Sequence, residues 1–269
     1  MTHDEPIGIA GTGRVAQALG ALLSPVSVVA GRDSLGDLPR QSRRIIIAVA
    51  DDAISEVASE LLACGLEGAV VLHVSAAAGP EALAILRTAG NSIGVLHPLQ
   101  TVPSAERGIQ TLRGATFAFA GDEEASVWAL DLIARLGGKA LPVNPSRWAY
   151  YHAAAVMASN YHVTLVDAAL ELAELAGIAR DTALEALAPI IRATTENILT
   201  SGPEQALTGP IRRGDSGTIR RHLAALEDSL PETRELYNAA GLRTIALARR
   251  AGLPPESARE IVKALSVPK

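Results

Sequence analysis

The chain has 269 residues, 48% of them hydrophobic and 20% charged, so it can bury a substantial core as one large domain or two smaller ones. A net charge of −5 argues against general nucleic-acid binding, which needs a basic surface. A single cysteine excludes an intramolecular disulfide and fits a reducing compartment. The sequence has neither a signal-peptide pattern nor a run of about 18 apolar residues, so we expect a cytoplasmic protein without a membrane span.

Over residues 1–143, short apolar runs alternate with helical stretches, which is the pattern of a parallel sheet covered by helices. Strands are predicted at residues 6–10, 26–30, 44–50, 69–74, 92–97, 115–120 and 138–143. Helices are predicted over 13–24, 51–65 and 121–138, the last two beginning near acidic residues and ending at glycine. This half of the chain therefore predicts an α/β domain.

Residues 144–269 lack strand signals. Asn144 is a predicted N-cap, Pro145 suits the first helical position, and nothing breaks the pattern before Gly177, so we expect one helix of about 32 residues. The later helices are predicted from Asp181 to about Ser201, Asp215 to about Asp228, Pro231 to Ala251, and Pro255 to Leu265. The second domain, 144–269, is therefore expected to be all-helical.

A glycine loop follows the first predicted strand. "IGIAGTGRVAQALG" places Gly11, Gly13 and Ala16 in G-x-G-x-x-A spacing, so that Gly11 allows a tight turn and Gly13 lets backbone N–H groups approach a pyrophosphate. The helix N-terminus then faces the anion. A merely structural glycine turn is the alternative to a Rossmann-type dinucleotide site. The predicted cofactor contacts of the loop are Gly11, Thr12, Gly13, Arg14 and Val15.

The end of the second predicted strand favours NADP(H) over NAD. Ala30 and Gly31 stand where NAD sites carry an acidic residue for the ribose 2′-hydroxyl. Arg32 follows and can pair with a 2′-phosphate, while Ser34 can add a hydrogen bond. Asp33 could play the acidic role instead, although it lies late for that function.

Three other strand ends carry candidate residues, because the carboxyl ends of strands line the ligand crevice in such sheets. Val49, Ala50 and Asp51 in "AVADD", together with Ser75, are predicted beside the nicotinamide ribose; helix capping is the alternative for Asp51. His97 and Gln100 in "LHPLQTVP" are predicted to touch nicotinamide or substrate, and simple loop structure is the alternative there.

The segment "IAVADDAISEVASEL" resembles the corresponding part of 6-phosphogluconate-dehydrogenase-like Rossmann domains, which include ketopantoate and pyrroline-carboxylate reductases. With "LHPLQTVP", "YYHAAAVMASNYHVTLVDAA" and "ALTGPIRRGDSGTIRRHLAAL", the whole chain resembles the bacterial family that joins a Rossmann-like domain to a C-terminal domain of the DUF2520 type. The resemblance implies an NADP-linked oxidoreductase, with ketopantoate reduction its most specific activity. It also implies a homodimer formed through the C-terminal helices.

In ketopantoate reductases, the first long helix of the C-terminal domain carries a lysine and two asparagines at four-residue spacing, the lysine being the proton donor. The resemblance places His152 at the lysine and Val156 and Asn160 at the asparagines, so only Asn160 matches. Helical geometry puts Ser159 within about 20° of His152, and a histidine pKa of about 6.5 suits proton donation. The alternative is a buried histidine with a structural hydrogen bond, or a dimer contact.

"LTGPIRRGDSGTIRRHL" is a second polar concentration. Thr208, Gly209 and Pro210 are expected to form a turn. Arg213, or its neighbour Arg212, is a candidate for binding a substrate carboxylate, and we place Asp215 with it as a substrate-site residue. The alternative is a helix that Asp215 caps, with solvated arginines.

The sequence thus predicts an NADP(H)-dependent oxidoreductase that reduces a small 2-oxo acid, with His152 and Asn160 as catalytic residues. Imine or β-hydroxyacid reduction on the same scaffold is one alternative. A non-catalytic NADP(H)-sensing dimer is another, since Val156 replaces a catalytic amide. No Cys/His spacing suggests a metal site.

Overall fold

The computed structural model describes residues 5–226 and 230–266. The chain forms two compact units, residues 1–161 and residues 162–269. The predicted domain boundary at residue 143 coincides with the end of the last strand, but the boundary between the compact units lies later. The reason is that Trp148 is buried against the first unit, where its indole N–H donates to the carbonyl oxygen of Ala76 at 2.7 Å.

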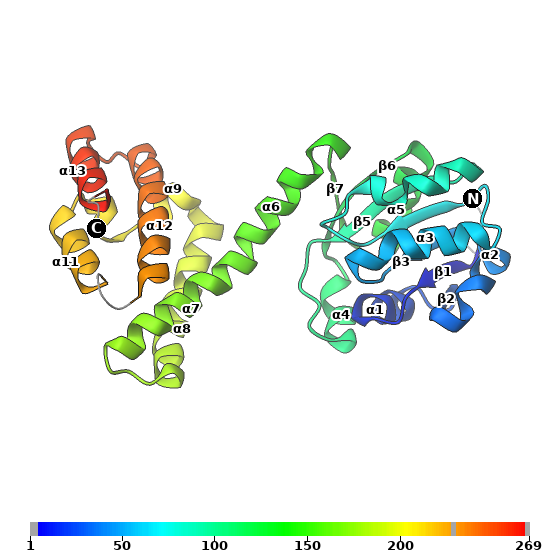
Figure 1. Cartoon of the computed structure of the whole chain (residues 1–269), viewed down its shortest axis with the longest axis horizontal. Coiled ribbons are helices and arrows are strands. Elements are labelled where there is room, and N and C mark those ends of the chain that lie inside the picture. The colour runs from blue at the N-terminus through cyan, green and yellow to red at the C-terminus, as the bar shows by residue number, and fades with distance from the viewer. Residues whose placement is uncertain (1–4, 227–229, 267–269) are drawn as a thin grey trace. The chain divides into compact units, whose positions relative to one another are not determined.

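A seven-stranded sheet forms the centre of the first unit within the described residues (Figure 1), and each predicted strand is present. The strands are β1 (Ile7–Ala10), β2 (Ser27–Ala30), β3 (Arg44–Ile47), β4 (Val70–His73), β5 (Ser92–Pro98), β6 (Thr116–Gly121) and β7 (Lys139–Pro142). They lie in the order β2-β1-β3-β4-β5-β6-β7. Ile9 of β1 pairs with Val29 on one side and with Ile46 on the other, so the carboxyl ends of these three strands lie together.

The expected parallel sheet has one exception among its described strand pairs, since β5 and β6 run antiparallel. After β5 the chain forms α4 (Ala105–Leu112), which packs against α1 (Arg14–Leu22). The backbone N–H of Leu99 then donates to the carbonyl oxygen of Thr116 at 2.8 Å, so β6 starts beside the end of β5. A strand that starts at that edge of the sheet must run back along its neighbour.

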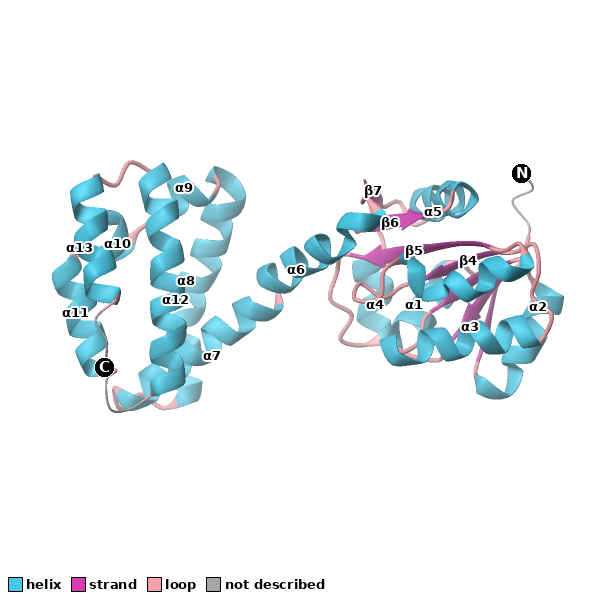
Figure 2. Cartoon of the chain, turned by 45° about the horizontal axis from the view of Figure 1, so that its top comes forward, coloured by secondary structure: helices cyan, strands magenta, loops and turns pink. Residues whose placement is uncertain are grey.

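Helices cover both faces of the sheet (Figure 2). One face packs against α1, α4 and α5 (Glu123–Arg135), and the other against α2 (Leu38–Gln41), α3 (Ile54–Ala63) and the 3₁₀ helices η1 (Arg32–Asp37) and η3 (Pro80–Ala89). In β3, Ile46 packs on the first face, whereas Ile45 and Ile47 pack on the second, because successive side chains of a strand alternate. Burial of both faces explains why this strand is apolar throughout.

The prediction of one uninterrupted helix from Asn144 to Gly177 is wrong. Asn144 does cap, since its Oδ1 accepts from the N–H of Ser146 at 3.0 Å, but the first turn is the 3₁₀ helix η4 (Pro145–Arg147). Helix α6 (Trp148–Ala158) then ends at Ser159, and α7 (Asn160–Leu175) follows. Ser159 has φ −116° and ψ −70°, which is too far from helical values to continue the regular hydrogen-bond ladder.

Helices form the second unit. Those after α7 are α8 (Arg180–Ser201), α9 (Pro203–Ala206), α10 (Gly209–Arg213), α11 (Ser216–Ala225), α12 (Pro231–Arg250) and α13 (Pro255–Leu265). Helices α10 to α13 share a core that includes Ile219, Ile245 and Ile261. Helix α8 continues through Pro189.

Two predictions about α10 and α11 have different outcomes. Gly209 begins α10, so the turn predicted there is wrong. Asp215 caps α11, which was the alternative to its predicted substrate role, since its carboxylate accepts from the N–H of Thr218 at 2.9 Å. The predicted end of that helix near Asp228 lies outside the described residues.

Candidate functional site

The glycine loop joins β1 to α1. Gly11 has φ +131°, and a Cβ there would lie 2.3 Å from the carbonyl oxygen of Ala48, so the turn excludes any side chain. At Gly13 a Cβ would meet no atom within 4 Å, which leaves open space above the loop. Gly13 is also the N-cap of α1, and no side chain in the described part of the chain caps this helix. The first N–H groups of α1 are therefore available to an external acceptor.

A pocket of about 210 Å³ lies beside this loop, at the ends of β1, β2 and β3. Gly11, Thr12, Arg32 and Val49, all predicted cofactor residues, line it together. Glu56 of α3 lines it too, and its carboxylate accepts from the Arg32 guanidinium at 2.9 Å. The structure thus gathers residues from separate segments at the place where the sequence predicts the adenosine end of a cofactor.

Arg32 is held loosely. Its side chain is 81% exposed and that of Glu56 is 66% exposed, so water screens the pair. Ser34 does not line the pocket; its hydroxyl lies 3.4 Å from the carbonyl oxygen of Gly31. Because its pair with Glu56 is weak, Arg32 can turn toward another anion with little loss of free energy.

Two further loop residues have protein contacts of their own. The guanidinium of Arg14 donates to the carbonyl oxygen of Pro103 at 3.1 Å, which joins the loop to the segment after β5. The side chain of Val15 is partly buried and packs against the core on one face of the sheet.

The predicted residues at the ends of β3 and β4 also lie in turns. Ala50 is the N-cap of the 3₁₀ helix η2 (Asp51–Ala53) and Ala53 is the N-cap of α3, so Asp51 occupies neither capping position. The hydroxyl of Ser75 accepts from the N–H groups of Ala77 and Ala78 at 3.1 and 3.2 Å. These bonds fix the turn after β4 and leave the hydroxyl proton of Ser75 free to point elsewhere.

A larger pocket, of about 590 Å³, lies between the end of β5 and helix α6. The predicted residues that line it are His97, Gln100, His152, Ser159 and Asn160. All of them belong to the first unit. The structure therefore brings both predicted catalytic residues to one pocket with both predicted residues of the "LHPLQTVP" segment.

Tyr151 is the residue of this pocket that the sequence analysis missed. Its hydroxyl lies 2.6 Å from Nδ1 of His97, and the two rings meet edge to face. Its ring also contacts Trp148, with centroids 5.0 Å apart. The signal available in the sequence was the spacing of Trp148 and Tyr151, three residues apart on a helix in a chain with 3% aromatic residues.

Burial sets the ionisation of this pair. It lowers the pKa of His97 to about 4, with the nearby His152 acting in the same direction and Asp51 opposing both. Burial likewise raises the pKa of Tyr151 to about 12. At neutral pH the pair is therefore an uncharged imidazole hydrogen-bonded to a protonated phenol.

The predicted substrate residues Arg213 and Asp215 belong to the second unit. Arg213 ends α10 and is exposed. The hydroxyl and N–H of Thr218 hold the pKa of the Asp215 carboxyl below its usual range, because both donate to that carboxylate. The observed role of Asp215 is thus the capping role that the sequence left as an alternative.

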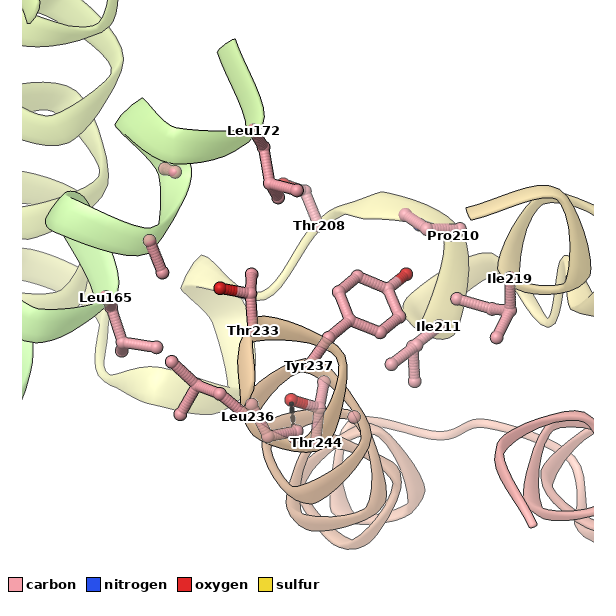
Figure 3. Close-up of a pocket in the computed structure, with 14 residues that line it drawn as sticks. Leu165, Leu172, Thr208, Pro210, Ile211, Ile219, Thr233, Leu236, Tyr237 and Thr244 are labelled. Atoms are coloured by element: carbon pink, nitrogen blue, oxygen red, sulfur yellow. Dashed lines mark hydrogen bonds between the residues drawn. The ribbon is translucent and has the colours of Figure 1, made fainter. Parts of the chain in front are cut away.

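The second unit contains a mostly apolar pocket of about 320 Å³, formed by α7, α10, α11 and α12 (Figure 3). Leu165 and Leu172 of α7 face it from one side, and the ring of Tyr237 extends from α12 toward Ile211 (Figure 3). The hydroxyl of Tyr237 lies 2.8 Å from Nδ1 of His222. Neither Arg213 nor Asp215 lines this pocket.

Residues 5–226 and 230–266 contain neither a candidate metal site nor a candidate membrane-spanning helix. No group of three or more His, Cys, Asp or Glu side chains there is arranged to hold a metal ion. None of the helices in those ranges combines the length and the apolar character that a membrane span requires.

Residues 115–244 match the family model of DUF2520, a domain of unknown function. This match confirms the resemblance to DUF2520 proteins that the sequence motifs indicated. A search of curated proteins gives no significant match to the chain.

Solved structures share the fold over most of the chain. A Bacteroides fragilis protein assigned as an NADP oxidoreductase is 21% identical, with a TM-score of 0.71 over 90% of this chain and 98% of that one. Pyrroline carboxylate reductase of Plasmodium falciparum, solved with NADP bound, is 13% identical, with a TM-score of 0.60 over 97% of this chain and 100% of that one. A reductive aminase of Aspergillus terreus, in complex with NADPH, is 16% identical, with a TM-score of 0.56 over 97% and 92%. These similarities confirm the predicted fold class.

Proposed function

We propose that the chain is an NADP(H)-dependent reductase of a small 2-oxo acid, with ketopantoate as the first candidate substrate. One observation carries the cofactor assignment. The open space at Gly13 lies beside the pocket that Arg32 lines, where the carboxyl ends of β1, β2 and β3 lie together. The NADP or NADPH bound to the structural neighbours supports the same assignment.

The residues present fit NADP(H). A diphosphate would accept from the uncapped N–H groups of α1, in the space that a side chain at Gly13 would fill. Arg32 would bind the 2′-phosphate, for which it can leave Glu56, and Ser34 stays a second candidate there. When bound, NADPH supplies the hydride. The remaining predicted cofactor contacts are Gly11, Thr12, Arg14, Val15, Val49, Ala50, Asp51 and Ser75.

The substrate would occupy the pocket at the end of β5. Its carbonyl carbon receives hydride and its oxygen receives a proton, so a positioned donor is required. The sequence assigns that donor to His152 and the orienting role to Asn160, both of which line the pocket. His97, Gln100 and Ser159 line it as well. Arg213 stays a predicted ligand of a substrate carboxylate, and Asp215, two positions later in the chain, stays a predicted substrate residue.

A homodimer and a reducing, cytoplasmic location belong to the same proposal. Helices α7 and α8 expose large apolar side chains, among them Val163, Ile190 and Leu199, and exposed apolar faces of this kind commonly cover one another in oligomers. Sedimentation of the purified protein tests the dimer. The lone cysteine, Cys64, is exposed and free, which suits a reducing compartment.

Imine reduction is the second candidate function. The structural neighbours named for imine or amine chemistry, a pyrroline carboxylate reductase and a reductive aminase, favour it. It uses the same cofactor residues and needs a proton donor in the same pocket.

The test is NADPH oxidation by the purified protein with ketopantoate, with other 2-oxo acids and with cyclic imines, against NADH and a control without substrate. Turnover of ketopantoate with NADPH supports the first proposal, and turnover confined to imines supports the second. NADPH binding without oxidation by any of these substrates would contradict the reductase and favour a cofactor sensor.

A further inference from the structure

We propose that the hydroxyl of Tyr151, hydrogen-bonded to His97, donates the proton that completes the reduction, in place of His152. In this assignment Tyr151 is a catalytic residue and His97 a positioning residue. The inference rests on the reductase function proposed above, and it applies equally to a carbonyl or an imine substrate.

The Tyr151 hydroxyl is fixed from three parts of the first unit. Helix α6 carries the side chain, and His97 at the end of β5 bonds to the hydroxyl at 2.6 Å. The ring lies against Trp148, which is itself held by its bond to the carbonyl oxygen of Ala76, after β4. The hydroxyl is thus placed at the pocket before any ligand arrives, which saves the entropy of ordering a donor.

His152 lacks comparable support. It follows Tyr151 on the same helix, so its side chain leaves the axis about 100° away. It lines the same pocket, but within the described residues no hydrogen-bond partner holds its ring. A donor that must be ordered during the reaction is less effective than one already in place.

The proton balance uses both ring nitrogens of His97. The substrate carbon gains hydride, and the oxygen (or imine nitrogen) takes the proton of the Tyr151 hydroxyl. The phenolate that is left takes the proton from Nδ1 of His97, while Nε2 takes one from solvent in the pocket. The net change is one hydride, which NADPH would supply when bound, and one proton from water. Exchange of the ring proton of His97 with water then restores the Nδ1–H tautomer for the next turnover.

The surroundings of His97 favour this relay. The ionisable groups that act on it are His152 on α6, His73 at the end of β4, Asp51 on η2, and Tyr151 itself. The two histidines and burial disfavour the imidazolium, and only Asp51 opposes them. A neutral imidazole can pass a proton from one nitrogen to the other, which a fully protonated ring cannot do.

Tyr151→Phe tests the donor, because it removes the hydroxyl and leaves the ring against Trp148. We expect kcat to fall by about 100-fold to 10,000-fold, the range for loss of a general acid, with NADPH affinity unchanged. Tyr150→Phe is the matched control: Tyr150 is the adjacent tyrosine, is 71% exposed and stacks with Arg147, so kcat should not change. Thermal unfolding of both variants shows whether either is misfolded.

Two variants of His97 test positioning. His97→Asn places an amide near the position of Nδ1 and can still bond to Tyr151, whereas His97→Leu cannot. The asparagine variant should therefore retain more of kcat than the leucine variant, and a merely structural histidine would not show that order.

Two further measurements do not depend on the activity of the variants. In the ligand-free protein, ¹⁵N NMR should show His97 neutral at pH 7, with a ring signal that moves in Tyr151→Phe and not in Tyr150→Phe. In single turnovers of the wild type, the rate should stay flat between about pH 5.5 and pH 9, since the pKa of His97 is about 4 and that of Tyr151 about 12. A donor that acts as an imidazolium would instead lose activity as the pH rises, because it loses its proton to the solvent.

The outcomes separate this inference from the function on which it rests. Lack of turnover by the wild type with oxo acids and imines overturns the reductase and the donor together. An active wild type whose Tyr151→Phe variant keeps its full rate overturns only the donor, as does a His152→Ala variant that loses activity while Tyr151→Phe does not. A loss confined to Tyr151→Phe and His97→Leu supports the inference.

Discussion

Replacing Arg32 with glutamine should separate binding of NADPH from binding of NADH. The variant keeps a polar side chain at the pocket and loses the positive charge that would meet a 2′-phosphate. Hydrogen bonds to charged groups contribute about 1.5 to 3 kcal/mol. The competing pair with Glu56 is exposed on both sides and holds Arg32 by no more than about 1 kcal/mol. Most of the free energy of the bond between Arg32 and the 2′-phosphate should therefore appear in the affinity for NADPH.

The expected result is an NADPH dissociation constant raised by about 10-fold to 100-fold, since each 1.4 kcal/mol corresponds to about tenfold. NADH has no 2′-phosphate, so its affinity should change by less than about threefold. Fluorescence titration of the reduced nicotinamide measures both constants. Arg40→Gln is the matched control, because Arg40 is 82% exposed, pairs with Asp37 at 3.8 Å and lies outside the pocket. Equal losses for the two nucleotides would refute the role assigned to Arg32.

Four other substitutions give separable outcomes. Gly11→Ala should lower the melting temperature, because the new Cβ would lie 2.3 Å from the carbonyl oxygen of Ala48. Gly13→Ala should leave the melting temperature unchanged and weaken NADPH binding, because its Cβ meets only open space. Equal losses of melting temperature in the two variants would contradict this reasoning. Burial lowers the pKa of His73 to about 4, so the unfolded chain binds more protons than the folded one between about pH 4 and 6.5. His73 should therefore contribute about 2 kcal/mol to the stability that urea unfolding shows to be lost between pH 7 and pH 5, and the loss in His73→Gln should be smaller by about that amount. Asp215→Ala should cost about 1 kcal/mol of stability through the lost α11 cap, and an unchanged KM would show that Asp215 does not bind substrate.

Most features that short stretches of sequence encode were predicted correctly, although the turn expected at residues 208–210 was not. The run of isoleucines in β3 faces two cores, and its apolar character follows from that local arrangement. The glycine loop was predictable because only glycine tolerates φ +131° at Gly11. The caps at Asn144 and Asp215 bond to N–H groups two and three residues away, so a few neighbouring residues specify each of them.

The features decided by tertiary structure depend on residues distant in the chain. His97 and Tyr151 are 54 positions apart, and their bond exists only because β5 ends beside α6. The antiparallel direction of β6 and the helix break at Ser159 were not predicted, and no local glycine or proline signals that break. The sequence by itself determined the strands, the glycine loop and the helix caps, because each is set by periodicity or steric limits over a few residues. Only the folded chain could join the imidazole of His97 to the hydroxyl of Tyr151, because a contact between distant segments depends on how whole strands and helices pack.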